Sequence, residues 1–258
     1  MEDASKTKCE GRLFLKMKGK WHIVSNERIA EKIYRMTLRG ETEGIRPGQF
    51  VEIAVPGCYL RRPISVCDIA DDLLTIIYKT IGEGTARMAQ MKSGETLDIL
   101  TGLGNGYNLA KAGKEVLLIG GGVGVPPLIC AAKQLRQSGK NVHVVIGFNT
   151  KSEVFGEECF TALGCQVSVC TMDGSYGVKG VVTDLLHKPA PFYYACGPLP
   201  MLKVLLRTIG TNGQISMEER MGCGAGLCMG CTIETKDGFK RVCKEGPVFS
   251  ADALKIEN

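Results

Sequence analysis

The chain has 258 residues, of which 44% are hydrophobic and 23% charged, and its formal net charge is +5 at pH 7. This length is enough for two small domains or one large one. The charge is modest and is not gathered into a basic run, and no apolar run approaches the ~18 residues of a membrane-spanning helix, so we expect no nucleic acid and no membrane as partners.

Short β-type runs broken by glycine and proline make up the first part of the chain. The expected strands are 21–26, 33–38, 49–55, 64–68, 74–78 and 96–100, with one helical stretch at 85–91. Strands of this length and spacing favour a small antiparallel barrel or sandwich. We therefore expect an N-terminal antiparallel β-barrel domain over residues 20–110.

Two motifs in the barrel region are candidates for holding a phosphate. Arg62 begins an expected strand in the RRPIS motif, where a guanidinium can pair bidentately with a phosphate. The IIYK run is the expected paired strand, and the GEGT motif after it opens a helix whose free N–H groups favour an anion. Each motif alone is more often solvated surface or a plain helix cap. The two motifs together, on a barrel that precedes a parallel sheet, are a much more specific signal for phosphate binding.

From Glu115 onward, apolar runs alternate with helical stretches. The expected strands are 116–119, 142–146, 167–171 and 192–195, and the expected helices are 126–137, 152–163, 181–187 and 198–209. Near-continuous apolar strands that alternate with helices indicate a parallel sheet covered on both faces. We expect a central parallel α/β nucleotide-binding domain over residues 111–213. The fold class is thus a multidomain combination of α+β and α/β.

A glycine-rich turn, GGGVGVPP, closes the first expected parallel strand and opens a helix. Its glycines let the backbone approach a pyrophosphate, and the helix N-terminus favours the charge. The run differs from the G-x-G-x-x-G fingerprint, and a tight turn without a ligand is the alternative. We expect nicotinamide dinucleotide binding at Gly120, Gly121, Gly122 and Gly124.

The dinucleotide specificity depends on residues at later strand ends. Rossmann sites often place an acid about 20 residues after the glycines to bind the ribose diol. The corresponding GFNT run has no acid, and Asp173 in the TMDGSYG run could serve instead. No arginine lies near either strand end, which favours NAD over NADP.

The turn Cys196-Gly197-Pro198 follows another expected strand, and such strand ends line the crevice of a parallel sheet. Cys196 is equally well explained as a small buried residue. No side chain has the features of a general acid or base. Hydride transfer requires proximity and alignment rather than proton chemistry, so we assign no catalytic residue.

Four cysteines near the C-terminal end have the plant-type spacing of [2Fe–2S] ligands, Cys223-x4-Cys228-x2-Cys231-x11-Cys243. Glycines among them let the loop fold tightly and bring N–H groups to the sulfurs. A zinc knuckle is the alternative, although paired C-x2-C units are more usual there. We expect a small cluster-binding segment over residues 214–258 and a chain that moves single electrons.

Taken in order, RRPIS, IIYK, GEGT, GGGVGVPP, CGP and the four cysteines resemble the ferredoxin reductase superfamily. The stretches SMEERMGCGAGLCMGC and VCKEGPVF resemble, more narrowly, the electron transfer subunits of dihydroorotate dehydrogenase B. The resemblance covers residues 20–255. It implies that FAD is bound by Arg62, Pro63, Ile64, Ser65, Ile77, Tyr78, Lys79, Gly84 and Thr85. Ile64 replaces an aromatic residue of many superfamily members, which removes one contact to the flavin.

The resemblance also implies a mechanism and a partner. FAD exchanges a hydride with NAD and passes electrons singly to the cluster. The cluster exchanges them with an FMN-containing catalytic subunit that oxidises dihydroorotate to orotate in pyrimidine biosynthesis. The implied assembly is a heterotetramer with two copies of each subunit. This chain alone is not expected to oxidise dihydroorotate.

Two other functions are possible from the same residues. A subunit of an NAD(P)H-dependent ferredoxin or sulfide reductase shares the flavin and nicotinamide domains, but its cluster often has an aspartate where this chain has Cys223. A zinc-stabilised binding module leaves RRPIS, GEGT and GGGVGVPP without a role. The other eight cysteines lack disulfide-like spacing, and the first 20 residues lack the apolar segment of a signal peptide, so we expect a cytoplasmic protein.

Overall fold

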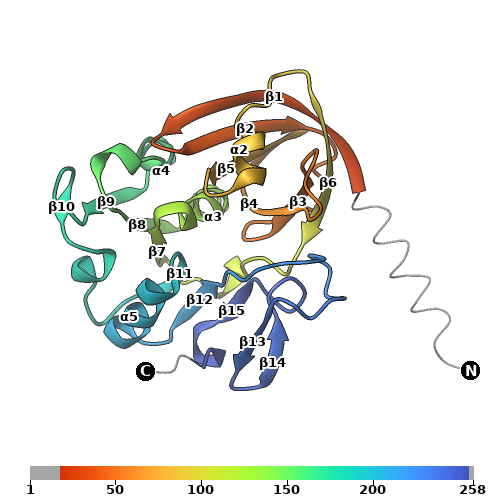
Figure 1. Cartoon of the computed structure of the whole chain (residues 1–258). Coiled ribbons are helices and arrows are strands. Elements are labelled where there is room, and N and C mark those ends of the chain that lie inside the picture. Colours follow the sequence, from red (N-terminus) through yellow and green to blue (C-terminus); the bar gives the residue numbers. More distant parts are fainter. Residues whose placement is uncertain (1–17, 256–258) are drawn as a thin grey trace, which may run out of the picture.

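The computed structural model describes residues 18–255, and the first part of the chain is a closed barrel (Figure 1). Its strands are β1 (Lys18–Ala30), β2 (Ile33–Arg39), β3 (Phe50–Ala54), β4 (Arg62–Ala70), β5 (Leu73–Lys79) and β6 (Thr96–Leu103). They follow the order β1-β2-β5-β4-β3-β6 and all neighbouring pairs are antiparallel. The expected antiparallel barrel is confirmed. The residues considered for a signal peptide lie almost wholly outside the described range.

A short helix, α2 (Glu83–Met88), packs against the barrel core. Met88 is completely buried in this core. The Asn26 side-chain amide on β1 donates to the carbonyl oxygens of Met88 and Met91, both at 2.9 Å. These bonds occupy carbonyls at the end of the helix, which therefore ends earlier than the expected range 85–91; it also begins two residues earlier, at Glu83.

The second sheet has seven strands in the order β10-β9-β8-β7-β11-β12-β15. They are β7 (Glu115–Gly121), β8 (Asn141–Phe148), β9 (Gln166–Thr171), β10 (Val178–Lys179), β11 (Phe192–Cys196), β12 (Gly213–Ser216) and β15 (Val248–Ser250). All neighbours are parallel except β12 and β15, which are antiparallel. The sheet is therefore mixed at one edge and parallel elsewhere.

Helices cover both faces of this sheet, as expected for near-continuous apolar strands. On one face, Leu118 packs in a core with residues of α3 (Pro126–Gln137) and α4 (Glu157–Ala162). On the other face, Leu117 and Ile119 pack in a core with residues of α5 (Leu199–Ile209). The remaining helical elements are the 3₁₀ turns η1 (Leu109–Lys111), η2 (Gly122–Gly124), η3 (Lys151–Glu153), η4 (Val182–Leu185) and η5 (Ala251–Ala253).

Two expected helices differ from the structure. The range 152–163 is divided into η3 and α4, because Gly156 between them has a φ of +83° that no continuous helix accepts. The range 181–187 contains only η4, after which Leu186 is extended, three residues before Pro189. Only one short turn of the expected helix therefore forms.

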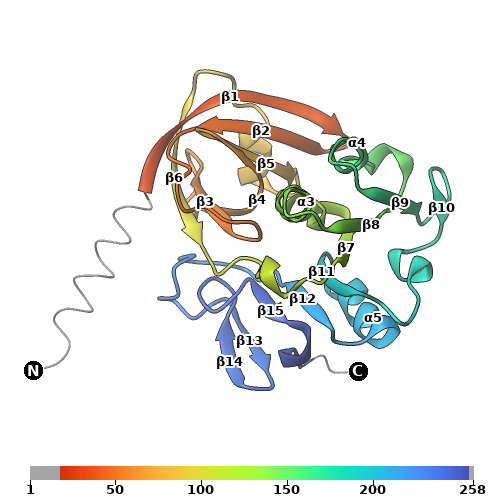
Figure 2. The same cartoon turned by 180° about the vertical axis from the view of Figure 1, so that it is seen from behind.

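The C-terminal part of the chain joins the second sheet through β12 and β15 and adds a hairpin, β13 (Thr232–Thr235) and β14 (Gly238–Arg241). Residues 217–231, here called the cysteine loop, connect β12 to β13. In both views this loop lies between the barrel and the hairpin (Figures 1 and 2). No helix within residues 18–255 is long and apolar enough to cross a membrane.

Candidate functional site

A cavity of about 400 Å³ lies on the barrel, and we call it the barrel cavity. It is lined by the ends of β4 and β5, the start of α2 and residues 216–219 and 221 beyond β12. The structure brings all nine residues with the implied flavin role to its wall: Arg62, Pro63, Ile64, Ser65, Ile77, Tyr78, Lys79, Gly84 and Thr85. These residues come from two antiparallel strands and the helix that follows them.

Arg62 lies directly against the start of α2. A Cβ atom on Gly84 would lie 2.1 Å from Arg62 Nε, so only glycine permits this approach. The Thr85 hydroxyl accepts from the N–H groups of Ile81 and Gly82 at 3.1 and 3.3 Å and fixes the turn before the helix. The Tyr78 hydroxyl donates to Asn26 Oδ1 at 2.9 Å.

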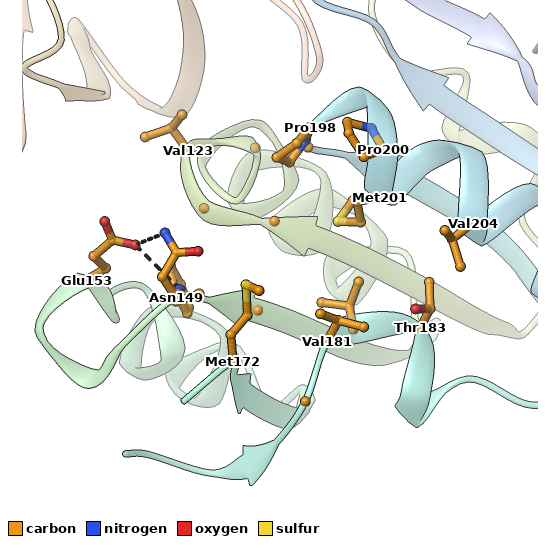
Figure 3. A pocket seen from close by; sticks show the side chains of 18 of the residues that line it. Val123, Asn149, Glu153, Met172, Val181, Thr183, Pro198, Pro200, Met201 and Val204 are labelled. Atoms are coloured by element: carbon orange, nitrogen blue, oxygen red, sulfur yellow. Dashed lines mark hydrogen bonds between the residues drawn. The ribbon is translucent and has the colours of Figure 1, made fainter. Parts of the chain in front are cut away.

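A second cavity of about 550 Å³ lies at the carboxyl ends of β7, β8, β9 and β11, and we call it the sheet cavity (Figure 3). Strand ends of this kind are the usual ligand site of an open α/β sheet. Five of the residues expected to bind a dinucleotide line it: Gly121, Gly122, Gly124, Gly197 and Pro198.

The other three expected residues do not line the sheet cavity. A Cβ atom on Gly120 would lie 2.8 Å from Val125 Cγ2, so this glycine allows the close approach of the following helix. Cys196 is buried, and burial raises the pKa of its thiol. Asp173 is exposed, and its Oδ1 accepts from the Ser175 N–H at 2.9 Å. Met172, the residue directly before Asp173, lines the sheet cavity instead.

The two cavities adjoin, because Lys79, Val123 and Glu218 line both. Lys79 Nζ on β5 pairs with Glu153 Oε1 at 2.8 Å. Glu153 Oε2 also accepts from Asn149 Nδ2 at 2.7 Å, a bond visible in Figure 3. The hydrogen bond from Lys79 lowers the pKa of Glu153. Desolvation by the surrounding protein raises the pKa of Glu218, whose side chain lines both cavities.

Sequence reasoning assigned no role to several wall residues. Those of the sheet cavity include Asn149, Glu153, Met172, Val181, Val182, Thr183, Pro200, Met201, Val204 and Glu218. Those of the barrel cavity include Phe50, Ser216, Met217, Glu218, Glu219, Met221 and Pro247. For residues 216–221, the one feature of the sequence that could have indicated a place in the site was their position directly before Cys223.

The four cysteines form two pairs. Cys223 and Cys228 are in hydrogen-bonding contact near the surface, and Cys231 and Cys243 are in contact in the interior. A diiron cluster needs two thiolates for each iron, and this arrangement supplies them. Within residues 18–255, no three or more His, Cys, Asp or Glu side chains are grouped for one metal ion.

Backbone N–H groups of the cysteine loop point at the sulfurs. Cys223 Sγ accepts from the N–H groups of Ala225, Leu227 and Cys228 at 3.2–3.4 Å, and Cys243 Sγ accepts from Gly226 at 3.1 Å. Burial raises the pKa of Cys223, but these donors outweigh it and lower the value to about 6. The donors favour thiolate, which is the form that binds iron, so the residues fit a [2Fe–2S] cluster.

The loop is closely packed at its glycines. Gly224 and Gly226 have φ values of +63° and +81°, which glycine adopts without strain. A Cβ atom on Gly224 would lie 2.5 Å from Glu52 Oε1. Burial raises the pKa of Glu52 to about 7, with Arg61 acting to lower it.

Comparison with known proteins identifies relatives over most of the chain. It is 43% identical over 253 residues to the electron transfer subunit of NAD(+)-dependent dihydroorotate dehydrogenase B from Fusobacterium nucleatum. It is 45% identical over 250 residues to the subunit of the same name from Bacillus caldolyticus. Each alignment covers 91% of this chain and 97% of the relative.

The C-terminal segment and the fold give concordant results. Residues 218–255 match the family model described as the iron-sulfur cluster binding domain of dihydroorotate dehydrogenase B. A solved NADH-dependent reduced ferredoxin-NADP oxidoreductase, described in terms of flavin-based electron bifurcation, superposes with a TM-score of 0.83 at 30% identity, covering 91% of this chain and 89% of that one. A ferredoxin NADP+ reductase from Neisseria gonorrhoeae shares the fold at 18% identity, with a TM-score of 0.65 and coverages of 79% and 95%. The chain therefore belongs to the family of electron transfer subunits of NAD(+)-dependent dihydroorotate dehydrogenase B.

Proposed function

We propose that this chain relays electrons between NAD at the sheet cavity, FAD at the barrel cavity and a [2Fe–2S] cluster at the four cysteines. FAD, when bound, supplies the step from two-electron hydride chemistry to single-electron transfer. The observation that carries the proposal is the order of the sites. The two cavities share Lys79, Val123 and Glu218, and residues 216–221 run from the barrel cavity into the cysteine loop.

The barrel cavity offers the groups that a flavin dinucleotide needs. The Arg62 guanidinium can pair with a phosphate, and the Ser65 hydroxyl can bond a polar atom of the ring system. The backbone of β5 at Ile77 and Tyr78 borders the cavity, while the Tyr78 hydroxyl is engaged with Asn26. Gly84 keeps the space that Arg62 occupies.

The sheet cavity has features of an NAD site. The backbone at Gly121, Gly122 and Gly124 can approach a pyrophosphate. Among the lining residues, Lys79 is the one basic side chain, and it is paired with Glu153. No lining cation is therefore available for a 2′-phosphate, which favours NAD over NADP. We place Asp173 at the rim, beside Met172, where its carboxylate can accept from a ribose hydroxyl.

The cysteine loop is the proposed contact with an FMN-containing catalytic subunit, in a heterotetramer with two copies of each chain. Cys228 is exposed, and the side chains beside it, Leu227 and Met229, are 78% and 54% exposed. An apolar surface around a redox centre lets a partner approach closely and exclude water. We also infer a cytoplasmic location, because the cysteines within residues 18–255 are all free thiols.

The test is coupled activity in a reconstituted complex. We expect the chain, coexpressed with an FMN-containing dihydroorotate dehydrogenase subunit, to support reduction of NAD by dihydroorotate. A Cys223→Ser variant should lose this coupling and keep its flavin absorbance, whereas Cys58→Ser, which changes a cysteine outside the cluster, should retain both. A complex that oxidises NADH with ferredoxin and shows no dihydroorotate activity would favour an NAD(P)H-dependent reductase instead.

A further inference from the structure

A buried carboxyl with an unpaired oxygen lies next to the cysteine loop. Glu52, on β3, is 1% exposed. Among the buried side-chain oxygen and nitrogen atoms of residues 18–255, Glu52 Oε1 is the one that has no hydrogen-bond partner. An unpaired buried polar atom is costly, so native proteins keep one where it has a use.

The contact between Glu52 and the cysteine loop is direct. The three atoms nearest to a Cβ placed on Gly224 would be Oε1, Cγ and Cδ of Glu52, at 2.5, 2.6 and 2.9 Å. The Glu52 side chain thus packs against the residue that follows Cys223. Gly224 has a φ of +63°, and the N–H groups of Ala225 and Leu227 after it donate to Cys223 Sγ.

Glu52 also lies next to the wall of the barrel cavity. On β3 it pairs with Pro63 of β4, which lines that cavity. Its carbonyl oxygen accepts from Arg61 Nη1 at 3.2 Å, which fixes the backbone. The charged groups that act on its carboxyl are Arg61, Arg62 and Cys223. Glu52 is therefore a neighbour of both the barrel cavity and the cysteine loop.

We propose that Glu52 is a positioning residue for the cluster, which seats the Cys223 turn through Gly224 and sets the reduction potential of the cluster through its carboxyl. Net charge and hydrogen bonding near the sulfurs are the main determinants of the potential of such clusters. A negative carboxylate disfavours an added electron, so Glu52 lowers the potential. This inference rests on the proposed cluster site.

The experiment compares Glu52→Gln, which keeps the shape and removes the charge, with the parent protein and with Asp68→Asn. Asp68 is a barrel carboxyl that pairs with Lys133 on α3 at 2.9 Å, away from the cysteine loop. Iron content, flavin absorbance, the electron paramagnetic resonance spectrum and the midpoint potential of the cluster are measured at pH 8 on the purified full chain. We expect Glu52→Gln to favour the reduced cluster by about tenfold, which is ~59 mV for one electron, and Asp68→Asn to match the parent.

Each outcome decides the proposal. Full iron content with a higher potential, or loss of iron with the flavin retained, supports a role specific to the cysteine loop. Full iron content with the parent's spectrum and potential overturns it, as does joint loss of iron and flavin, because Glu52 would then serve only the barrel. If the parent itself binds no [2Fe–2S] cluster, the proposed function fails and the role of Glu52 fails with it, which distinguishes the two cases.

Discussion

The two adjacent arginines of the RRPIS motif have different surroundings, which gives them different roles. Arg61 Nη2 pairs with Asp98 Oδ1 at 2.6 Å, and Arg61 Nη1 donates to the carbonyl oxygens of Asp98 and Glu52. Its guanidinium therefore joins β3 to β6. Arg62 instead lines the barrel cavity beside Gly84. One arginine stabilises the barrel and the next one is placed to bind a ligand.

We expect Arg62→Ala to weaken flavin binding about 10- to 100-fold, because a hydrogen bond to a charged group contributes ~1.5–3 kcal/mol. The melting temperature of the flavin-free protein should change little. The measurement is the dissociation constant for FAD by flavin fluorescence. Arg61→Ala is the matched control, with the opposite pattern: a lower melting temperature and near-normal flavin affinity. Equal effects of both substitutions on affinity would contradict this division.

The contribution of Glu153 to the stability of the fold can be measured by itself. Its pKa is lowered by the bond from Lys79, so the folded protein binds this proton less readily than the unfolded chain does. The pair then adds stability above the ordinary glutamate pKa of about 4.3 and loses it as the pH falls. We expect Glu153→Gln to cost about 1 kcal/mol at pH 7 and less at pH 3, measured by urea unfolding.

The matched control for Glu153 is an exposed pair of the same type. Glu27 and Arg35 pair at 3.3 Å with side chains that are 60% and 42% exposed, against 20% and 29% for Glu153 and Lys79. Glu27→Gln should therefore leave stability unchanged at both pH values. A Glu153→Gln variant with the same lack of effect would show that the bridge between barrel and sheet adds no stability.

At the scale of elements, Asn105 connects the end of β6 to the segment before β15. Its side-chain amide donates to the carbonyls of Glu245 and Val248 at 2.9 and 2.7 Å, and its Oδ1 accepts from the Val248 N–H at 3.1 Å. Three side-chain bonds thus hold the last strand of the sheet against the barrel.

We expect Asn105→Ala to cost about 2–3 kcal/mol, at about 1 kcal/mol for each bond. For a chain of this size that corresponds to a fall of ~5–10 °C in melting temperature, measured by calorimetry. Asn108→Ala is the control, because the Asn108 side chain accepts only from the nearby Ala110 N–H, at 3.2 Å. Equal losses in the two variants would show that β6 and β15 are joined mainly by other contacts.

The elements that the sequence predicts best are those set by local patterns. The strands of the barrel and β7, β8 and β11 follow apolar periodicity and agree with expectation. The break at Gly156 and the early end of α2 depend on one backbone angle and on bonds from distant Asn26, which periodicity does not contain. Strands β12 and β15 are short and acquire their role only by pairing with a sheet formed earlier in the chain.

At the scale of the whole molecule, the surface around Cys228 is the proposed contact with the catalytic subunit. We expect the double variant Leu227→Glu and Met229→Glu to abolish complex formation with the catalytic subunit, because two charges would be buried at the interface. NADH oxidation with an artificial acceptor should stay near normal. Size-exclusion chromatography of the mixed subunits measures the first, and a dye-reduction assay the second.

The control for this surface is Val178→Glu on β10, an exposed apolar residue at the far edge of the sheet. It should leave the complex intact. Complex formation that survives the double variant, or that fails in the control, would place the partner elsewhere on the molecule.

The candidate site was predictable where it consists of contiguous motifs. RRPIS, IIYK, GEGT and the cysteine spacing are each local in sequence, and the structure brings the first three to one cavity. Glu218 and Glu153 were not predictable, because each has its place only where the barrel meets the sheet. A single sequence does not indicate which side chains come together where the barrel meets the sheet.

The continuity of β12 with the cysteine loop has a consequence for how the chain can be divided. β12 pairs with β11 inside the second sheet, and the residues directly after it line the barrel cavity before the chain reaches Cys223, with Glu218 lining the sheet cavity as well. A chain shortened before β12 would lose one wall of the barrel cavity, and Glu218 of the sheet cavity, together with the cysteines. A single uninterrupted stretch of backbone thus connects the three proposed redox sites, and exchanging the cysteine segment as a separate module would open the proposed flavin site to water.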